Sequence, residues 1–363
     1  MTASKDSTAV RAGEELDLTA LDSYLRQQLS AQASDFEPTA TVEIEQFPGG
    51  HSNLTYLIRY GSQEFVLRRP PVGPVAPTAH DMPREYKLLS VINPRFPLAP
   101  KPVLLCEDES IIGVPFYLME RRRGFIVRFE VPSQIGENLE SRRRLSEAVI
   151  DTLVALHAVD IYSSGIVNIG KPEGFVTRQV HGWADRWQRS KTSEIAEMDQ
   201  VIHWLVERIP PDPIGGAAIV HNDFKLDNIM LDADDPARVV AVLDWEMCTV
   251  GDPLVDLGLF LGYWTMKGGT GAGKNNSLRA VTNEPGWMTR QEIIDQYETR
   301  TKRDLSAIVF YETFARFKVA VVIQQIYFRY LKGQTRDERF RNFDGLVSEL
   351  TRDALELAQR SGI

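Results

Sequence analysis

The chain of 363 residues is long enough for two domains, and its content of apolar and charged residues is typical of a globular protein. Its net charge of −9 argues against nucleic-acid binding, because contacts to phosphates need an excess of Lys and Arg on one face. The two cysteines and six histidines show no zinc-site spacing. With only two cysteines, which do not form a C-x-x-C pair, no disulfide framework is expected, and the cytoplasm is therefore the default location. No apolar run is long enough to span a bilayer, and we therefore expect neither a membrane nor nucleic acid as a partner.

Residues 1–120 are predicted to form an N-terminal nucleotide-binding lobe. After a solvated tail over residues 1–15, leucines at helical spacing predict a helix over 18–29. Alternating apolar residues then predict strands at 41–47, 54–60, 64–68, 102–107 and 114–120. The run Asp81-Met82-Pro83 predicts the start of an inserted helix, because Asp caps helices and Pro favours their first turn.

Residues 121–363 are predicted to form a C-terminal helical lobe that carries the catalytic and substrate sites. Apolar residues at helical spacing predict helices at 141–159, 305–331 and 342–360. Short β segments are expected at 217–220, 229–231 and 239–243. The fold class is therefore α+β, with a small antiparallel β lobe that includes one helix and a larger, mainly helical lobe.

One run between two of the short β segments suits phosphoryl transfer. In His221-Asn222-Asp223-Phe224-Lys225-Leu226-Asp227-Asn228, Asp223 would orient the attacking hydroxyl and the amide oxygen of Asn228 would bind magnesium. Asp244, at the end of the next β segment, would be a second magnesium ligand, and Lys225 would place a positive charge near the transferred phosphate. Because Asp and Asn also cap turns, the interpretation rests on the whole constellation rather than on any single residue.

The segments HNDFKLDN and VLDWEMCTVGDPLVDLG resemble the aminoglycoside phosphotransferase family, which has the two-lobed protein-kinase-like fold. The resemblance covers about residues 40–345 and implies ATP and Mg²⁺ as cofactors. It also implies a catalytic role for Asp223 and Lys225, and a metal-binding role for Asn228 and Asp244.

Other segments resemble one branch of this family, the kinase-like domains associated with acyl-CoA dehydrogenases. They are FPGGHSNLTYLI, FVLRRPPVGPVAPTAHDMPREYKLL and FYLMERRRG. The resemblance implies phosphorylation of hydroxyacyl-CoA intermediates. The resemblance to the wider phosphotransferase family implies that Asp252 and Asp256 brace the catalytic loop, although Asp252 is equally well placed to cap a helix next to Pro253.

The predicted nucleotide site lies in the N-terminal lobe. Arg68 stands where most kinase-like folds carry Lys, and we expect Glu85 to pair with it. Met119 and Glu120 occupy the position at which the family contacts adenine through backbone atoms. The loop between the first two strands is expected to cover the phosphates, although a plain hairpin turn explains it equally well, and its candidate residues are Gly49, Gly50, Ser52 and Asn53.

Two further features bear on the substrate. The run Gly268–Lys274 is close to a P-loop, but Asn275 replaces the required Ser or Thr, and a loop near the substrate entrance is expected instead. Arginines at 121–123, 128 and 142–144 favour an anionic acceptor over a polycationic aminoglycoside. The alternative is a solvated helix face whose charges are balanced by Glu137 and Glu140.

The sequence therefore predicts an ATP- and Mg²⁺-dependent phosphotransferase that acts on a hydroxyl of a small molecule. A hydroxyacyl-CoA or another anionic metabolite is one option for the acceptor. The alternatives are an aminoglycoside, small-amine or sugar kinase, a catalytically silent nucleotide-binding regulatory module, and a P-loop NTPase that uses Lys274.

Overall fold

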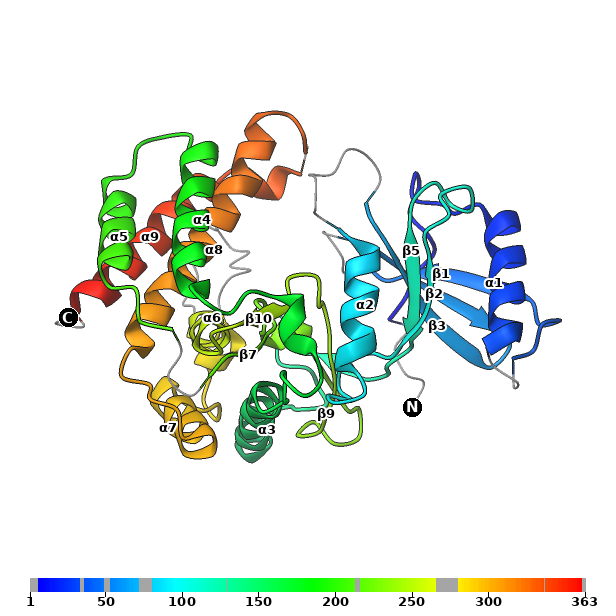
Figure 1. Cartoon of the computed structure of the whole chain (residues 1–363), viewed down its shortest axis with the longest axis horizontal. Coiled ribbons are helices and arrows are strands. Elements are labelled where there is room, and N and C mark those ends of the chain that lie inside the picture. The colour runs from blue at the N-terminus through cyan, green and yellow to red at the C-terminus, as the bar shows by residue number, and fades with distance from the viewer. Residues whose placement is uncertain are drawn as a thin grey trace. The chain divides into compact units, whose positions relative to one another are not determined.

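The computed structural model describes residues 6–32, 36–48, 53–71, 80–128, 130–212, 216–265, 280–335 and 337–360 (Figure 1). The candidate phosphate-loop residues Gly49, Gly50 and Ser52 and the run Gly268–Lys274 lie outside these described residues.

The chain divides into two compact units. The first comprises Met1–Arg123 together with Ala241–Glu246, and the second comprises Gly124–Val240 and Met247–Ile363. The sequence-based boundary at residue 120 assigns Asp244 to the C-terminal domain, whereas its segment packs with the first unit. The backbone N–H of Val242 donates to the carbonyl of Leu98 at 2.8 Å, and the Trp245 ring packs edge-on against Phe96.

The first unit is built on a five-stranded antiparallel sheet. The strands lie in the order β1-β2-β3-β5-β4. In this order, β2 and β3 pair from Leu54 opposite Arg69 to Tyr60 opposite Gln63. The bounds are β1 Val42–Gln46, β2 Leu54–Tyr60, β3 Gln63–Arg69, β4 Pro102–Cys106 and β5 Phe116–Glu120.

Two helices cover opposite faces of this sheet (Figure 1). Successive residues of a strand point to opposite faces. Phe116 of β5 packs edge-on against Tyr24 of α1 (Leu18–Gln32), and the next residue, Tyr117, packs edge-on against Tyr86 of α2 (Met82–Ile92). As predicted, α2 begins after Asp81, whose carboxylate accepts a hydrogen bond from the backbone of Arg84 at 2.9 Å.

The predicted solvated tail over residues 1–15 is mostly exposed in the part that the structure describes, but it is attached to the sheet. Thr8 and Gln46 exchange two backbone hydrogen bonds, at 2.8 and 2.9 Å, which extend the sheet beyond β1. Ser7 is buried and donates to Glu45 at 2.6 Å. A mostly exposed polar segment can be ordered in this way when its backbone pairs with an edge strand, and side-chain hydropathy does not reveal such pairing.

The second unit is mainly helical and contains two small sheets, β6-β8-β9 and β10-β7. Its long helix α8 packs against α4, α5, α6 and α9, so it forms the centre of the unit. The helices are α3 Leu139–His157, α4 Phe175–Ser190, α5 Ala196–Glu207, α6 Leu254–Trp264, α7 Arg290–Thr301, α8 Ile308–Leu331 and α9 Phe343–Arg360. The strands are β6 Phe125–Ile126, β7 Ala218–Val220, β8 Ile229–Leu231, β9 Val239–Val242 and β10 Thr249–Gly251.

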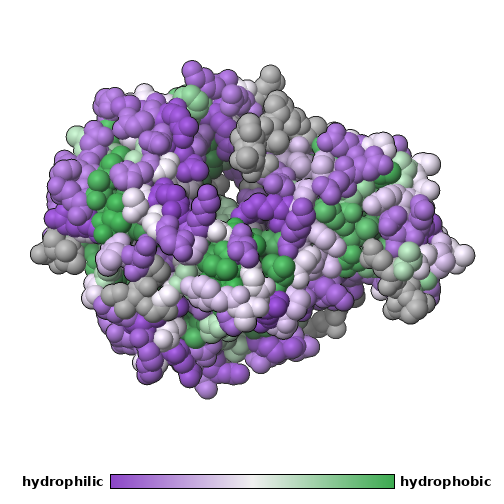
Figure 2. Space-filling view, viewed as in Figure 1, coloured by the Kyte–Doolittle hydropathy of each residue, from purple (hydrophilic) through white to green (hydrophobic). Residues whose placement is uncertain are grey.

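The predicted α+β class is therefore confirmed, as an antiparallel sheet with its helices and a mainly helical unit. In the described part of the chain, every helix is too short or too polar to cross a bilayer. Figure 2 shows a face on which hydrophilic residues predominate and apolar residues gather in separate patches.

Candidate active site

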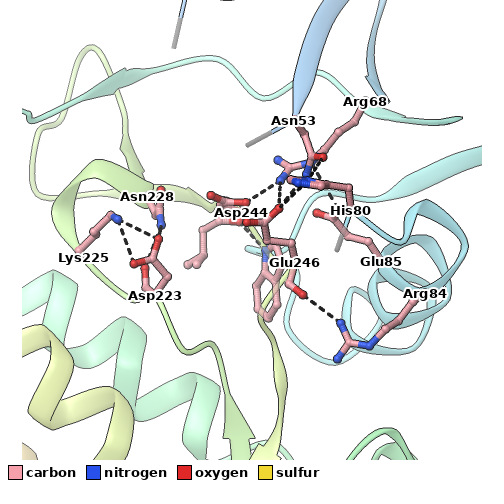
Figure 3. A network of polar contacts seen from close by, with 12 residues as sticks. Asn53, Arg68, His80, Arg84, Glu85, Asp223, Lys225, Asn228, Asp244 and Glu246 are labelled. Carbon is pink, nitrogen blue, oxygen red and sulfur yellow. Dashed lines mark hydrogen bonds and ion pairs between the residues drawn. The ribbon is translucent and has the colours of Figure 1, made fainter. Parts of the chain in front are cut away.

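The candidate catalytic loop of the second unit joins β7 to β8, and its Asp223 carboxylate is held by two neighbours (Figure 3). The Lys225 ammonium lies 2.9 Å from one carboxylate oxygen of Asp223 and 2.8 Å from the other. The side-chain amide of Asn228 donates to the Asp223 carboxylate at 2.9 Å and to its backbone carbonyl at 2.8 Å. The structure thus brings together the three residues that the sequence predicts for this loop, and the Asp223 side chain keeps 20% of its surface exposed.

Asp256 of α6 holds the start of this loop by hydrogen bonds to its backbone. Its two carboxylate oxygens accept the backbone N–H groups of His221, at 2.6 Å, and Asn222, at 2.7 Å. Asn222 has a φ of 66°, which is costly for a residue other than glycine and is found where the surroundings impose it. The buried His157 lies 3.4 Å from Asp256 and 2.7 Å from the hydroxyl of Tyr297. The carboxylate of Asp256 therefore orients the turn that leads into Asp223.

Of the two roles that the sequence left open for Asp252, the structure shows the helix cap, and its second oxygen contacts α8 rather than the catalytic loop. One carboxylate oxygen caps the next helix by accepting the backbone N–H of Leu254 at 2.9 Å. The other accepts the hydroxyl of Tyr311, in α8. Burial raises the pKa of the Asp252 carboxyl, while the Tyr311 hydrogen bond and the Leu254 N–H oppose that shift. Asp252 thus caps α6 and ties it to α8.

The electrostatic surroundings of Lys225 keep its ammonium charged. Burial lowers the pKa of Lys225, but Tyr263 and Asp223 together raise it above its ordinary value. The ammonium also lies 5.0 Å from the centre of the Tyr263 ring. Lys225 is therefore a fixed positive charge beside the Asp223 carboxylate.

In the first unit, Arg68 lies among three carboxylates (Figure 3). Its guanidinium approaches Glu85 at 3.3 Å, Asp244 at 2.6 Å and Glu246 at 3.5 Å. The pairing expected between Arg68 and Glu85 is present, and both residues are buried. Burial raises the pKa of the Glu85 carboxyl and the Arg68 charge opposes that shift. Glu246 was not singled out from the sequence, although it stands two residues after Asp244 in the same segment.

Asp244 has a φ of 67°, so it too occupies the left-handed region that a residue other than glycine rarely adopts. The neighbouring Trp245 is buried and its indole N–H donates to the Val242 carbonyl at 2.8 Å. That anchor holds the strained backbone, and the Asp244 side chain retains 31% exposure. Strain of this kind is concentrated at functional sites.

The side chain of Asn53 joins the same cluster. Its amide donates to the Glu246 carboxylate at 2.8 Å, and its amide oxygen lies 2.8 Å from the ring of His80. His80 also has a positive φ, of 60°. Asn53 is therefore engaged by its side chain, next to the loop residues that lie outside the described part.

The expected adenine contact at Met119 and Glu120 stays a prediction. Met119 is buried in β5, between β3 and β4. The Glu120 N–H already donates to the carbonyl of Lys101 at 2.9 Å, and its carboxylate binds Arg122 at 2.6 Å.

The candidate metal ligands are chemically suited to Mg²⁺, which prefers oxygen donors and binds through few protein groups. Both N–H contacts of Asn228 go to Asp223, so its amide oxygen is left available. Asp244 supplies a carboxylate, whose charge is shared with Arg68. In the described part of the chain, no group of three or more His, Cys, Asp or Glu side chains is arranged to hold a metal. Each of these oxygen donors, taken by itself, suits an ion that is also bound by water and by phosphate oxygens.

The arginine clusters do not have the arrangement expected of an anion site. Each arginine of the runs 121–123 and 142–144 has an acidic partner: Arg121 pairs with Asp6, Arg122 with Glu120, Arg123 with Glu64, Arg142 with Glu284, Arg143 with Glu147 and Glu292, and Arg144 with Asp235. The balanced-charge alternative therefore describes them, with partners other than the expected Glu137 and Glu140. Because acidic partners balance these charges, the clusters give no specific reason to expect an anionic ligand.

Comparison with known proteins shows the family to which the chain belongs. The model of the phosphotransferase enzyme family matches residues 43–287. The acyl-CoA dehydrogenase family member 11 of Rattus norvegicus is 35% identical over 366 residues, which cover 99% of this chain and 46% of the relative. The chain thus spans about half the length of such curated relatives.

Solved structures show the same fold. A structure from Ralstonia eutropha, described as a candidate aminoglycoside phosphotransferase, is 28% identical with a TM-score of 0.78, and the match covers 95% of this chain and 99% of the other. A ternary complex of the aminoglycoside phosphotransferase APH(4)-Ia with ADP and hygromycin B is 14% identical with a TM-score of 0.56, covering 94% and 99%. The predicted protein-kinase-like fold is confirmed, and the chain belongs to the phosphotransferase enzyme family.

Proposed function

We propose that the protein transfers the terminal phosphate of ATP to a hydroxyl of a small molecule, with Asp223 as the catalytic carboxylate. The observation that carries this proposal is the arrangement of the catalytic loop. Asp223 is oriented by Asn228 and Lys225, and the backbone turn before it is held by Asp256. An oriented and partly exposed carboxylate is what a hydroxyl acceptor needs.

In this reaction the acceptor oxygen forms a bond to the terminal phosphorus, the bond from phosphorus to the bridging oxygen breaks, and ADP leaves. Asp223 accepts the proton of the hydroxyl. Lys225 is close enough to share charge with the transferred group, as its ammonium lies within 3 Å of the Asp223 carboxylate. Asn228 and Asp244 would hold Mg²⁺, which neutralises charge on the phosphates.

Arg68 is proposed to bind the nucleotide phosphates. Its guanidinium is flanked by Glu85, Asp244 and Glu246, and the first of these carboxylates is almost fully buried. A buried carboxylate fixes the orientation of an arginine side chain. The remaining N–H groups of the guanidinium can then contact phosphate oxygens. The complexes of APH(4)-Ia with ADP support ATP as the donor.

For the acceptor we propose a hydroxyacyl-CoA. The support is the similarity over 98–99% of this chain to acyl-CoA dehydrogenase family members, whose names imply acyl-CoA chemistry in the same polypeptide. The paired arginine clusters add no support, so the acceptor has to be identified by experiment.

The experiment measures ADP release from MgATP with a panel of hydroxybutyryl-CoA, free hydroxybutyrate, choline, a hexose and hygromycin B. Hydroxybutyryl-CoA should accelerate release most, and EDTA should stop it until Mg²⁺ is restored in excess. Acceleration by hygromycin B alone would replace the proposed acceptor with an aminoglycoside. The absence of acceleration by every hydroxyl compound would favour the silent regulatory module.

The matched variants are Asp223→Asn and Asp234→Asn. Asparagine at 223 keeps the size of the side chain and an acceptor for the Asn228 amide but cannot take the proton, so kcat should fall about 10²–10⁴-fold with ATP binding retained. Asp234 is exposed in the turn after β8, and its variant should behave as wild type. Undiminished turnover in Asp223→Asn would refute the assignment of Asp223.

A further inference from the structure

Lys318 is a buried lysine in the middle of α8. Only 4% of its surface is exposed, and its neighbours Phe317 and Val319 are buried as well. An ammonium inside a helical unit is unfavourable unless polar groups surround it. Among the residues that the structure describes, no carboxylate forms an ion pair with Lys318 within 4 Å, so its burial is not explained by a salt bridge.

The Lys318 ammonium is directed at the turn that precedes Asp223. It donates a hydrogen bond to the backbone carbonyl of Asn222 at 2.9 Å. Its nitrogen also lies 5.5 Å from the centre of the Trp183 ring in α4, a distance at which an aromatic face attracts a cation. The charge is thus stabilised by a carbonyl dipole and a ring, both within the second unit.

Three contacts define the conformation of Asn222. Its N–H donates to Asp256 at 2.7 Å, its carbonyl accepts from Lys318 at 2.9 Å, and its side-chain amide donates to the carbonyl of Met247 at 3.0 Å. Asn222 has a φ of 66°, and its backbone would relax toward ordinary angles if these contacts did not restrain it. The Asn222 carbonyl belongs to the peptide group that joins Asn222 to Asp223, so a shift of this carbonyl turns the Asp223 side chain.

We propose that Lys318 is a positioning residue for phosphate transfer, whose ammonium holds the carbonyl of Asn222 and so keeps the Asp223 carboxylate directed at the acceptor hydroxyl. This inference rests on the phosphotransferase function proposed above. Lys318 acts through Asn222 and does not itself touch the reacting atoms.

The pH dependence of turnover distinguishes a positioning role of Lys318 from a purely structural one, because only a positioning role makes turnover depend on the protonation state of Lys318. Burial lowers the pKa of Lys318 to about 8. Asp223 and Asp256 oppose this shift, whereas Lys225 and Arg186 add to it. Because the pKa is lowered, the ammonium is present below about pH 8 and is lost above it. Loss of the charge weakens the hydrogen bond to Asn222, so turnover should decline on the basic side of the pH profile.

The test compares Lys318→Met, Lys318→Gln and the control Lys332→Met by steady-state ADP release from MgATP. Hydroxybutyryl-CoA is the phosphate acceptor in this assay. If hydroxybutyryl-CoA does not accelerate ADP release, the basal reaction with water as the acceptor is measured instead. Methionine removes both the charge and the donor at similar length, and glutamine restores a donor without the charge. Lys332 is an exposed lysine at the C-terminal end of α8, so its replacement controls for loss of a lysine from the same helix.

Lys318→Met should lower kcat about 10–100-fold, since small displacements of a catalytic group have effects of this size. KM for ATP should stay within about twofold, because the nucleotide residues proposed here lie elsewhere. The basic decline near pH 8 should disappear in both Lys318 variants, and Lys318→Gln should regain part of kcat. Lys332→Met should match wild type.

The inference is overturned if the Lys318 variants lower only the melting temperature and keep the wild-type kcat per folded enzyme and the decline near pH 8. If Lys318→Met does not fold, Lys318→Gln decides in the same way. Full activity of Asp223→Asn would instead refute the proposed function. An inactive Asp223→Asn beside wild-type behaviour of both Lys318 variants would remove this inference alone.

Discussion

Helices α6 and α8 approach so closely at Gly258 that no side chain fits between them. A Cβ at Gly258 would lie 2.6 Å from the carbonyl carbon and oxygen of Tyr311 and 2.7 Å from its Cβ. Non-bonded carbon atoms are normally about 3.5–4.0 Å apart, so Gly258→Ala requires a separation of the two backbones by roughly 1 Å. One turn further along α6, a Cβ at Gly262 would lie 3.4 Å from the Cβ of Ala315, which is close to an ordinary contact.

The two substitutions should therefore have opposite effects on the free energy of unfolding. In a helix, Gly→Ala alone stabilises by about 1 kcal/mol. Forcing a methyl group into a packed interface costs about 1–3 kcal/mol, and more when the obstructing atoms belong to backbone. We expect Gly262→Ala to be neutral or stabilising by up to about 1 kcal/mol, and Gly258→Ala to be destabilising by about 1–2 kcal/mol.

Differential scanning calorimetry of the two variants beside wild type measures this difference. For a unit of this size, about 1 kcal/mol corresponds to roughly 2–4 °C, so the melting temperatures of the two variants should differ by about 2–12 °C. Gly258→Ala should also lower turnover, because α6 carries Asp256 and is capped by Asp252, which binds Tyr311 across the same interface. Equal melting temperatures for the two variants would refute the close approach of α6 and α8.

Two other predictions concern acidic side chains of the second unit. Contacts with Arg143 and Thr289 lower the pKa of Glu292 to about 2, so its stabilising effect is complete above its ordinary pKa and is lost as the pH falls toward 2. Glu292→Gln should thus lower the melting temperature at pH 7, by the equivalent of at most about 1 kcal/mol for such an exposed pair. The difference should shrink as the pH falls and be nearly gone at about pH 2, and an undiminished difference there would contradict the role of charge. Arg290→Met should leave the fully buried Glu312 with only a more distant partner, Arg316, at 3.9 Å. Urea unfolding should then show that the free energy of unfolding falls by about 3–5 kcal/mol. A decrease below about 1 kcal/mol would show that Arg316 compensates.

The parts of the fold that follow from short-range patterns could be predicted from the sequence. The strand over 54–60 has the predicted bounds, and the helix after Asp81 begins where its cap and Pro83 indicate. The loop contacts of Asp223 also follow from spacing, since Lys225 and Asn228 are only two and five residues away. Helix α4 was not predicted, although its buried residues Val176, Val180, Trp183 and Trp187 stand at helical spacing, and the helix packs on α8.

The contacts that sequence patterns could not reveal join residues far apart in the chain, and they determine how each charge is used. Arg123 and Arg142 stand in conspicuous clusters, yet Glu64 and Glu284 pair with them and remove the reason to expect an anion there. Lys318 stands alone in an apolar helix and attracts no notice in the sequence. Its burial without an ion pair, and its hydrogen bond to a residue 96 positions earlier, are visible only in the structure. Charge density along a sequence is therefore a poor guide to function here, because a clustered arginine can be neutralised by distant acids while a solitary lysine contacts the catalytic loop.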